Sequence, residues 1–509
     1  MMHDNKLTGF QIPMKKTVAK VLILCSLFIS NIAFAQRITV VTTSAAGDRL
    51  TVKEKVDFNL IPVLSKDPML VVDQNEILIH PHFKFQQMDG FGASFLEAGM
   101  ICANSLEMKE KQMLFQSLFD TVQGAGFSVM KSPLAGNDFM SAGEWYSYND
   151  TPGDTAMNNF SIERDLKSNG LITYIKEARN YGHFLIQSPM DYPPDWMLTN
   201  IEDQKKQDVD EKYFPALAKY YLRYIQEYKK QGVNIDYLSL FNEPGIYTKI
   251  PYSKIETLLA DHVGPFFKEN HIDTKIQMCE ANHRLYGWNY FPQVLQNEKA
   301  AQYIGGLAFH GYDYQRNFDK IAELKQNYPQ YPIWMTEVCH AYVCGYPKSK
   351  PLPNYDYSDG DYWGNEIISD LESGVSGWIY WNMILDENGG PWLVSEHHGN
   401  PDFNAQQPVV VVNRKDKTVH YTALYYYLSH FSRYVRPGYA RISTYENIDG
   451  IRAIAFISPE NKIILEVLNS TGQNKEIKIR VNNQQAGLTI PAGSINTFFW
   501  QNSINNTKD

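Results

Sequence analysis

Two glutamates in this sequence each end a short apolar run of the kind that forms a buried strand. Glu243 follows the run in YLSLFNEPG, where Pro244 cannot extend strand pairing, and Glu337 ends the run in YPIWMTEVCH. If both runs are strands of a parallel barrel, both carboxyls lie at its C-terminal mouth, where such barrels carry their active sites. Cleavage of a glycosidic bond needs such a pair, one acid to protonate the leaving oxygen and one carboxylate below the sugar ring.

Either glutamate alone is more simply explained as a salt-bridged loop residue. The two together, at the ends of the fourth and seventh strands of a closed barrel, face each other across its mouth and favour a catalytic role. A retaining mechanism, in which one carboxylate forms a covalent intermediate, predicts a separation of about 5 to 5.5 Å between the two carboxyl groups. A separation of about 9 Å would instead indicate inversion.

Eight strand-like segments, separated by segments with helical spacing, predict the elements that position this pair. In chain order they are FQQMDGFGASF, GFSVMKSP, HFLIQSP, IDYLSLFNEP, KIQMCEAN, IGGLAFHGY, YPIWMTEVC and VSGWIYWN. The helical segments between them include LKSNGLITYIKEARNYG and YFPALAKYYLRYIQEYKKQG. Eight β/α units favour a closed (β/α)8 (TIM) barrel over an open doubly wound sheet, which usually has fewer strands and a glycine-rich phosphate turn that this sequence lacks.

After about Pro408 the sequence changes to short strands of alternating polarity, among them ARISTYE, IRAIAFIS, KIILEVLN, KEIKIRV and INTFFW. This pattern is typical of an all-β module. The segment RITVVTTSAAGDRLTVKEKV near the N-terminus has the same character, and we expect it to pair with the C-terminal strands. The predicted α/β fold therefore has a barrel over residues 85–429 and one additional β-sandwich domain built from residues 36–84 and 430–503.

Residues 1–35 have the pattern of a secretory signal peptide, with Met14 as an alternative start. Three lysines precede an apolar run, and a small-x-small cleavage site follows at Ala33-Phe34-Ala35. The apolar run is too short for a comfortable membrane span. We expect the mature protein to be exported to the periplasm or secreted.

The composition argues against several classes of partner and cofactor. The formal net charge of −9 disfavours nucleic acid and anionic membrane, since both are negatively charged. Cys339, His340 and Cys344 match no zinc-binding spacing, and no second ligand pair follows them, so we expect neither a metal nor another cofactor. The four cysteines after the signal segment permit a disulfide in an exported protein but do not require one.

Several motifs resemble those of glycoside hydrolase family 30, over nearly the whole mature chain. In chain order they are QQMDGFGASFLEA, DFMSAGEWYSYNDTPGD, SPMDYPPDWMLTN, FNEPG, LAFHGYDY, MTEVC and GWIYWNMILDENGGP. The resemblance implies a (β/α)8 barrel with a side β-sandwich made from both chain ends, and retaining hydrolysis of a β-glycoside. It assigns Glu243 as the general acid/base and Glu337 as the nucleophile.

The same resemblance implies roles for the residues around this pair. Asn242 would hydrogen-bond the sugar 2-hydroxyl, Asp138 would bind other hydroxyls of the glycone, and Trp381 would form the floor of the sugar pocket. His310 and Tyr312 would support or orient the nucleophile. Each also has an ordinary structural explanation, such as a turn-forming Asn or a Trp that fills the barrel. Further aromatic candidates for stacking on sugar are Trp196, Tyr146, Tyr148 and Trp392.

Two departures from the glucosylceramidases of this family bear on the substrate. Lys131 stands where they have arginine, and Met190 stands where they have tryptophan. An ammonium cannot reproduce the two-pronged hydrogen bonding of a guanidinium, and a thioether offers neither a flat face nor an indole N–H. We therefore expect both residues to line an altered glycone pocket.

The predicted function is a cofactor-free retaining β-glycosidase that cleaves a β-linked glucoside in the manner of a glucosylceramidase. Alternatives within the family are an endo-β-1,6-glucanase, a β-xylosidase or a β-fucosidase. A carbohydrate-binding protein on an inactive barrel is the alternative from another class. The presence of both glutamates argues against it, because a protein without turnover has no chemical need for two opposed carboxyls.

Overall fold

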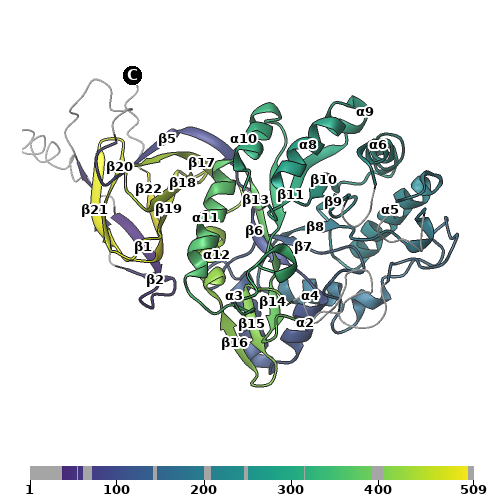
Figure 1. The fold of residues 1–509 in the computed structure, drawn as a ribbon, viewed down its shortest axis with the longest axis horizontal. Coiled ribbons are helices and arrows are strands. Elements are labelled where there is room, and N and C mark those ends of the chain that lie inside the picture. Colours follow the sequence, from purple (N-terminus) through teal and green to yellow (C-terminus); the bar gives the residue numbers. More distant parts are fainter. Residues whose placement is uncertain are drawn as a thin grey trace, which may run out of the picture.

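The computed structural model of this 509-residue chain describes residues 37–53, 55–60, 72–140, 146–199, 208–245, 250–313, 316–391 and 405–502. The chain forms two lobes, a helix-covered barrel and an all-β domain (Figure 1). The predicted signal peptide lies outside the described residues. Among the described helices, none is long and apolar enough to cross a membrane.

The eight predicted strands form one closed parallel barrel, which confirms the predicted fold class. The strands follow chain order around it, and β13 pairs with β6 to close the ring. Strand β5 of the all-β domain continues to Gln87, and the first barrel strand begins at Gly90. The bounds are β6 (Gly90–Ser94), β7 (Val129–Lys131), β8 (Leu185–Pro189), β9 (Tyr237–Ser239), β10 (Lys275–Ala281), β11 (Ile304–His310), β12 (Ile333–Glu337) and β13 (Gly377–Asn382).

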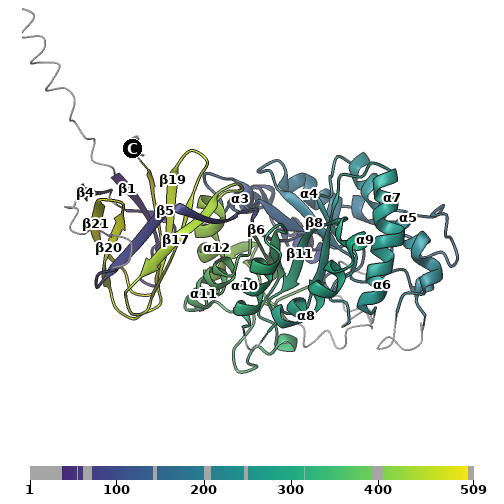
Figure 2. The same cartoon turned by 90° about the horizontal axis from the view of Figure 1, so that it is seen from above.

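Helices surround this barrel (Figure 2). The longest, α5 (Phe214–Lys230), has Pro215 in its first turn, where the missing N–H costs no hydrogen bond, and buries one face of Tyr, Leu, Ile and Ala side chains. The other helices are α2 (Glu97–Asn104), α3 (Met108–Phe119), α4 (Leu171–Ala178), α6 (Tyr252–Thr257), α7 (Gly264–Glu269), α8 (Arg284–Leu295), α9 (Glu298–Ala301), α10 (Phe318–Asn327), α11 (Asp359–Glu372) and α12 (Ala423–Tyr434).

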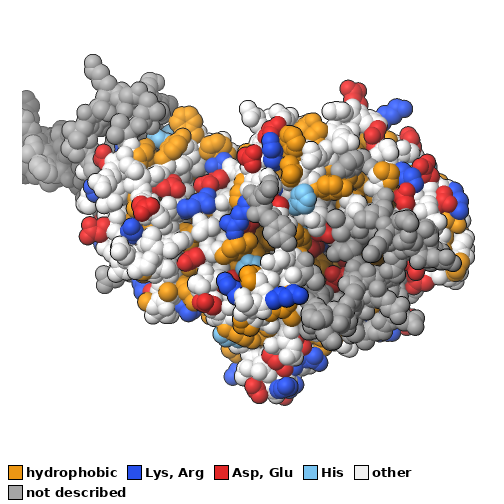
Figure 3. Space-filling model, in the orientation of Figure 1, with side chains coloured by type: hydrophobic (Ala, Val, Ile, Leu, Met, Phe, Trp, Pro, Cys, Tyr) orange, Lys and Arg blue, Asp and Glu red, His pale blue; other side chains and the backbone are white. Residues whose placement is uncertain are grey.

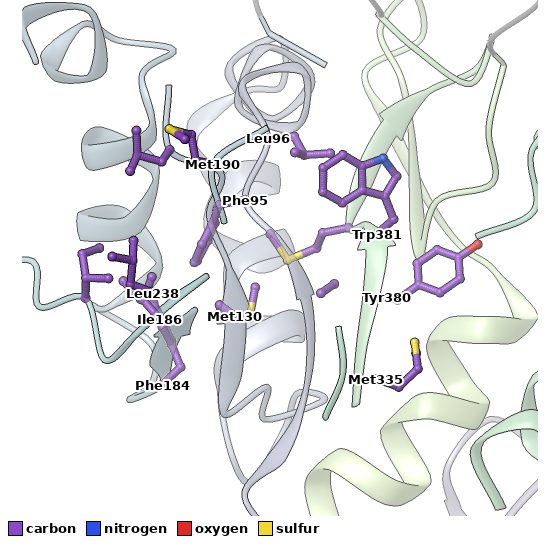
Figure 4. Packing of buried hydrophobic residues seen from close by; sticks show 14 of the residues in the cluster. Phe95, Leu96, Met130, Phe184, Ile186, Met190, Leu238, Met335, Tyr380 and Trp381 are labelled. Carbon is purple, nitrogen blue, oxygen red and sulfur yellow. The ribbon is translucent and has the colours of Figure 1, made fainter. Parts of the chain in front are cut away.

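The core between strands and helices is built from alternate strand residues. Met130, Ile186, Leu238 and Met335 are buried and belong to the main apolar cluster, to which helix residues such as Phe115 and Tyr174 also contribute. Figure 4 shows part of this packing. Because successive strand residues point to opposite faces, the residues next to these point into the barrel, and those nearest the C-terminal ends form the site described below.

The all-β domain joins both ends of the chain, as the sequence predicts. Strand β1 runs antiparallel to β22, with Thr39 opposite Phe499. The sheet order is β2-β1-β22-β19-β18-β17-β5-β20-β21-β4, with β3 beside β1. The bounds are β1 (Arg37–Ser44), β2 (Thr51–Val52), β3 (Val56–Asp57), β4 (Asn59–Leu60), β5 (Glu76–Gln87), β17 (Ala440–Glu446), β18 (Ile451–Ile457), β19 (Lys462–Asn469), β20 (Lys475–Val481), β21 (Gln484–Ile490) and β22 (Ser494–Gln501).

The segment between the barrel and the sandwich differs from the expected change to an all-β module after Pro408. Strands β14 (Ile384–Asp386), β15 (Val410–Asn413) and β16 (Thr418–Tyr421) form a separate small sheet. Helix α12 follows and packs against the first barrel strand as well as the sandwich strand β22, so it lies between the two lobes. Sequence polarity alone does not separate a short hairpin beside the barrel from the sandwich strands that follow.

Candidate active site

The interior of the barrel changes from apolar to ionic along the strands. A separate apolar cluster contains one residue from each of four strands: Val129, Tyr237, Trp334 and Ile379. Two positions further along the same strands, and hence on the same face, stand Lys131, Ser239, Thr336 and Trp381. The alternation of the strands therefore places polar and charged side chains at the C-terminal mouth.

Backbone irregularities at the mouth re-aim the side chains of the site. The pairing of β12 with β11 shifts register between Phe309 and His310, and His310 pairs with Glu337. This bulge allows Thr336 and Glu337, which are adjacent in sequence, both to point inward. Glu243 has a left-handed backbone with φ of 45°, a conformation that non-glycine residues adopt rarely and that is concentrated at functional sites.

Glu243 is buried, and its two carboxylate oxygens have different surroundings. His310 Nδ1 lies 2.7 Å from Glu243 Oε1, and Asn282 Nδ2 donates to the same oxygen at 2.8 Å. A carboxyl oxygen that accepts two hydrogen bonds is a poor place for a proton. Of the two oxygens, Oε2 is therefore the one that could carry a proton.

Glu337 is held through both of its oxygens. Lys131 Nζ donates to Oε2 at 2.6 Å, and the hydroxyl of Tyr312 donates to Oε1 at 3.0 Å. Donors on both oxygens fix the position and orientation of this carboxyl group. Tyr312 thus contacts the predicted nucleophile directly.

The two glutamates lie close together. Glu243, His310 and Glu337 each place a side-chain N or O atom within 4.8 Å of the others. The nearest oxygens of the two carboxyls are therefore no more than 4.8 Å apart. This distance agrees with the separation of about 5 to 5.5 Å expected for retention and is well below the range of about 6.5 to 9.5 Å for inversion.

The same three residues could in principle surround a metal ion. However, the ammonium of Lys131 lies 2.6 Å from Glu337 Oε2 and 3.4 Å from His310 Nε2. Burial lowers the pKa of His310, but Glu337 and the hydrogen bonds to Glu243 and Glu280 raise it to about 9, so the ring is an imidazolium at neutral pH. Two positive charges already occupy the place of a cation, and the group fits an acid/base pair better than a metal centre.

The structure contradicts the prediction that Lys131 lines the glycone pocket. Its side chain is 0% exposed, so it does not line the pocket but lies beneath the two carboxylates. Burial lowers the pKa of Lys131, but Glu337 and Glu280 outweigh it and hold the pKa above its ordinary value. Lys131 also donates to Asn242 Oδ1 at 3.3 Å, which leaves the amide nitrogen of Asn242 available to a sugar hydroxyl.

Met190 and Trp196 make contacts within the protein that hold the loops of the site. Met190 is fully buried among apolar side chains (Figure 4), and its carbonyl accepts from the backbone N–H of Asn242 at 2.8 Å. The indole of Trp196 donates to the carbonyl of Asn149 at 2.8 Å and packs edge-on against Tyr213. Both residues support the loops of the site from behind.

Trp381 and Asp138 remain candidates for sugar contact. Trp381 lies at the end of β13, with Lys131 Nζ 5.1 Å from the centre of its ring and Phe139 against its edge. Asp138 is half-buried in the loop after β7. Tyr148 is buried and bonded to Asp165, and Tyr146 packs under Arg164, so these two serve the loop structure. Trp392 lies outside the described residues.

The sequence reasoning missed three polar residues of this site. Glu280 is the last residue but one of β10, and Glu337 is the last residue of β12, so a third carboxylate near a strand end was a signal in the sequence. Asn282 follows two residues later and bonds Glu243. Asp191 is 4% exposed, and its Oδ1 is buried without a hydrogen-bond partner among the described residues. Burial and nearby anions raise the pKa of Asp191.

A cavity of about 750 Å³ opens beside Tyr312, between the segments that follow β11 and β12. Its wall includes Cys339, two residues after Glu337, and Tyr355 and Tyr362, which are partly exposed. Cys339 is free, as are Cys102 and Cys344, so the structure forms no disulfide among these three. The cavity lies on the β11 and β12 side of the mouth, whereas Asp138 follows β7 on the other side.

Comparison with protein families identifies the class of enzyme. The model of the glycosyl hydrolase family 30 TIM-barrel domain matches residues 88–435, and the model of that family's β-sandwich domain matches residues 440–498. The chain belongs to glycosyl hydrolase family 30. It is therefore a glycoside hydrolase, and the resemblance noted in the sequence is confirmed.

Individual members of family 30 resemble this chain over most of its length. Lysosomal acid glucosylceramidase of Mus musculus is 25% identical over 447 residues, which cover 84% of this chain and 83% of the mouse protein. Endo-1,6-beta-D-glucanase of Neurospora crassa is 25% identical over 391 residues, 74% of this chain and 77% of the fungal protein. The crystal structure of SrfJ from Salmonella typhimurium has the same fold, with a TM-score of 0.80 at 22% identity, over 92% of this chain and 100% of that one.

Proposed function

We propose that the protein is a retaining β-glycosidase that cleaves a β-linked glucoside, with Glu337 as the nucleophile and Glu243 as the general acid/base. The observation that carries this proposal is the short separation of the two carboxyls, at most 4.8 Å between their nearest oxygens. A water molecule would not fit between them and a sugar in the way that inversion requires. The roles follow from the surroundings of each carboxyl.

In the first step, Glu337 attacks the anomeric carbon and the bond to the leaving oxygen breaks. Glu243 gives its Oε2 proton to that oxygen, while His310 and Asn282 hold Oε1. The product is a glycosyl ester of Glu337 and a free alcohol. Tyr312 and Lys131 keep the attacking carboxylate in place before the bond forms.

In the second step, Glu243 acts as the base. Formation of the ester removes the negative charge of Glu337, but Lys131 and the His310 imidazolium stay positive. These two cations stabilise Glu243 as a carboxylate, which takes a proton from water as the water attacks the anomeric carbon. Glu337 leaves as a carboxylate, and Glu243 is again protonated.

Two substrate classes are supported, and the cavity beside Tyr312 favours one of them. The relatives include a glucosylceramidase and an endo-1,6-β-glucanase. The cavity lies on the side of the pair away from Asp138, where the leaving group would lie, and its wall contains partly exposed tyrosines as well as charged residues. Aromatic and polar walls suit the second sugar of a glucan better than the two alkyl chains of a glucosylceramide. Endo-β-1,6-glucanase activity is therefore the second candidate function.

Two variants test the roles of the pair. Glu243→Ala should nearly abolish cleavage of alkyl glucosides, whose leaving oxygen needs a proton, but should still form the glycosyl-enzyme from dinitrophenyl β-glucoside. The intermediate should accumulate, and azide should release it as β-glucosyl azide, since azide needs no base. Glu337→Ala should lose the covalent route with both substrates. A burst of dinitrophenolate from the Glu337→Ala variant, or none from Glu243→Ala, would overturn the assignment.

A second assay separates the substrate classes. The wild-type enzyme is incubated with aryl β-glycosides, glucosylceramide and β-1,6-glucan, and the products are sized by chromatography. Release of glucose alone indicates exo action, and a ladder of oligosaccharides indicates an endo-glucanase.

We further propose export, on the signal-like N-terminal pattern. We expect the intact mass of protein recovered from outside the cytoplasm to lack residues 1–35.

A further inference from the structure

A third buried carboxylate, Glu280, bonds the cations that hold the catalytic pair. Glu280 is 0% exposed and stands at the C-terminal end of β10 with a left-handed backbone, φ of 47°. Its carbonyl also accepts from the backbone N–H of Glu243 at 3.0 Å. The residue therefore contacts the acid/base through its backbone and reaches the rest of the site through its side chain.

The carboxylate of Glu280 accepts hydrogen bonds from five barrel strands. Oε2 accepts from Lys131 Nζ at 3.0 Å, lies 3.0 Å from His310 Nε2, and accepts from Thr336 Oγ1 at 2.9 Å. Oε1 accepts from Gln187 Nε2 at 2.8 Å and from Ser239 Oγ at 2.9 Å. These donors come from β7, β8, β9, β11 and β12, so the side chain links most of the ring.

Two bridges lead from this one carboxylate to the two catalytic glutamates. Lys131 joins Glu280 Oε2 to Glu337 Oε2, and His310 joins Glu280 Oε2 to Glu243 Oε1. Both bridging groups are buried cations, and neither would be stable there without an anion. Glu280 supplies a charge that stays ionised and does not take part in the reaction.

We propose that Glu280 is a positioning residue of the glycosidase reaction, which holds Lys131 and the doubly protonated His310 in place so that each catalytic glutamate keeps its position and its hydrogen bonds. The inference rests on the proposed roles of Glu243 and Glu337. It assigns no contact with substrate to Glu280, because its five donors occupy the carboxylate and its side chain is fully buried.

Loss of the Glu280 charge should shift the pH dependence of kcat/KM in one direction. The charged and titratable groups that face this cluster are Lys131, Asp138, Asp191, Glu243, His310 and Glu337. Glu280→Gln removes one negative charge from among them, and His310 then gives up its first proton at a lower pH. The basic limb of the kcat/KM profile should move down by about 1 pH unit, since a charge at this distance shifts a pKa by about that much or more.

Three variants are compared with wild type. Glu280→Gln should lower kcat about 100-fold, the effect expected when a catalytic group is misplaced by roughly 1 Å. It should also move the basic limb of the kcat/KM profile to lower pH. Glu280→Asp keeps the charge on a shorter stem, so it should lower kcat but keep the wild-type limb. Glu76→Gln removes a buried carboxylate that holds Arg480 and Gln485 in the sandwich, so it should lower stability without moving the limb.

A second readout does not depend on activity. NMR of ring-labelled histidine, with the His310 signal assigned by its loss in His310→Asn, should show an imidazolium near neutral pH in wild type and a lower titration in Glu280→Gln. An unchanged His310 titration together with an unmoved basic limb would overturn the proposal. Failure of the burst experiment on Glu243→Ala, with His310 shifted as expected, would instead overturn the catalytic roles and leave the link between Glu280 and His310 established.

Discussion

Replacement of Lys131 by methionine tests whether the ionic layer at the barrel mouth depends on one buried ammonium. Lys131→Met keeps roughly the same length and volume but removes the charge that lies 2.6 Å from Glu337 and 3.0 Å from Glu280. All three side chains are at most 8% exposed. Loss of one partner from a buried ion pair costs about 3 to 5 kcal/mol, because the remaining charge is uncompensated.

The lowered pKa of Glu280 leads to a similar value for the loss in the free energy of unfolding. Burial raises that pKa, but Lys131 and His310 outweigh it and lower it from 4.5 to about 2. A carboxyl with a depressed folded pKa stabilises the protein above its unfolded pKa, and this stability is lost as the pH falls through the folded pKa. The shift is worth about 3 kcal/mol at pH 7 and about 1 kcal/mol at pH 3. Lys131→Met removes most of it.

The assay is urea unfolding followed by tryptophan fluorescence at pH 7 and pH 3. The control is Lys111→Met, which breaks a pair with Glu177 that is partly exposed and should cost less than about 1 kcal/mol. We expect Lys131→Met to lose about 3 kcal/mol at pH 7, and the deficit to shrink at pH 3. A deficit no larger than that of Lys111→Met, or one that does not change with pH, would refute the reasoning.

Three further predictions concern activity. Lys131→Arg should lower kcat by a similar factor, roughly tenfold, for all tested glycosides, because the side chain lies below the pocket; a changed ranking of sugars would show direct contact. Tyr312→Phe removes the bond to Glu337 Oε1 and should lower kcat about 10- to 100-fold with little change in KM; an unchanged kcat would exclude that role. Asp191→Ala should raise KM more than it lowers kcat if its unpartnered oxygen binds a sugar hydroxyl, and Asp191→Asn should be milder; equal effects on kcat alone would contradict sugar binding.

The surface in Figure 3 agrees with the composition. On that face Lys and Arg side chains are interspersed with Asp and Glu side chains. The charges that act on the catalytic pair are those inside the mouth, where Lys131, His310 and Glu280 are buried. Surface charges are screened by solvent and contribute little to binding a neutral sugar. Buried charges interact more strongly because the local dielectric is low.

The sequence by itself determined the barrel and the pair. Apolar runs bounded by turn residues give all eight strands, because strand burial depends on local polarity and alternation. Glu243 and Glu337 could be found because each stands at the end of its own strand. The pairing of the N-terminal segment with β22 could also be predicted, since both have the alternation of a sheet that is buried on one face.

Tertiary structure alone decided what surrounds that pair. Lys131 lies 111 residues from Asn242 and 206 from Glu337, and the sequence does not specify that its ammonium lies beneath them and not in the pocket. That position depends on the stagger of neighbouring strands and on the bulge at His310, which sets the side chains that point inward. Glu280 is one more strand-end carboxylate in the sequence, and only the closed ring, which brings donors from five strands to it, separates its role from those of Glu243 and Glu337.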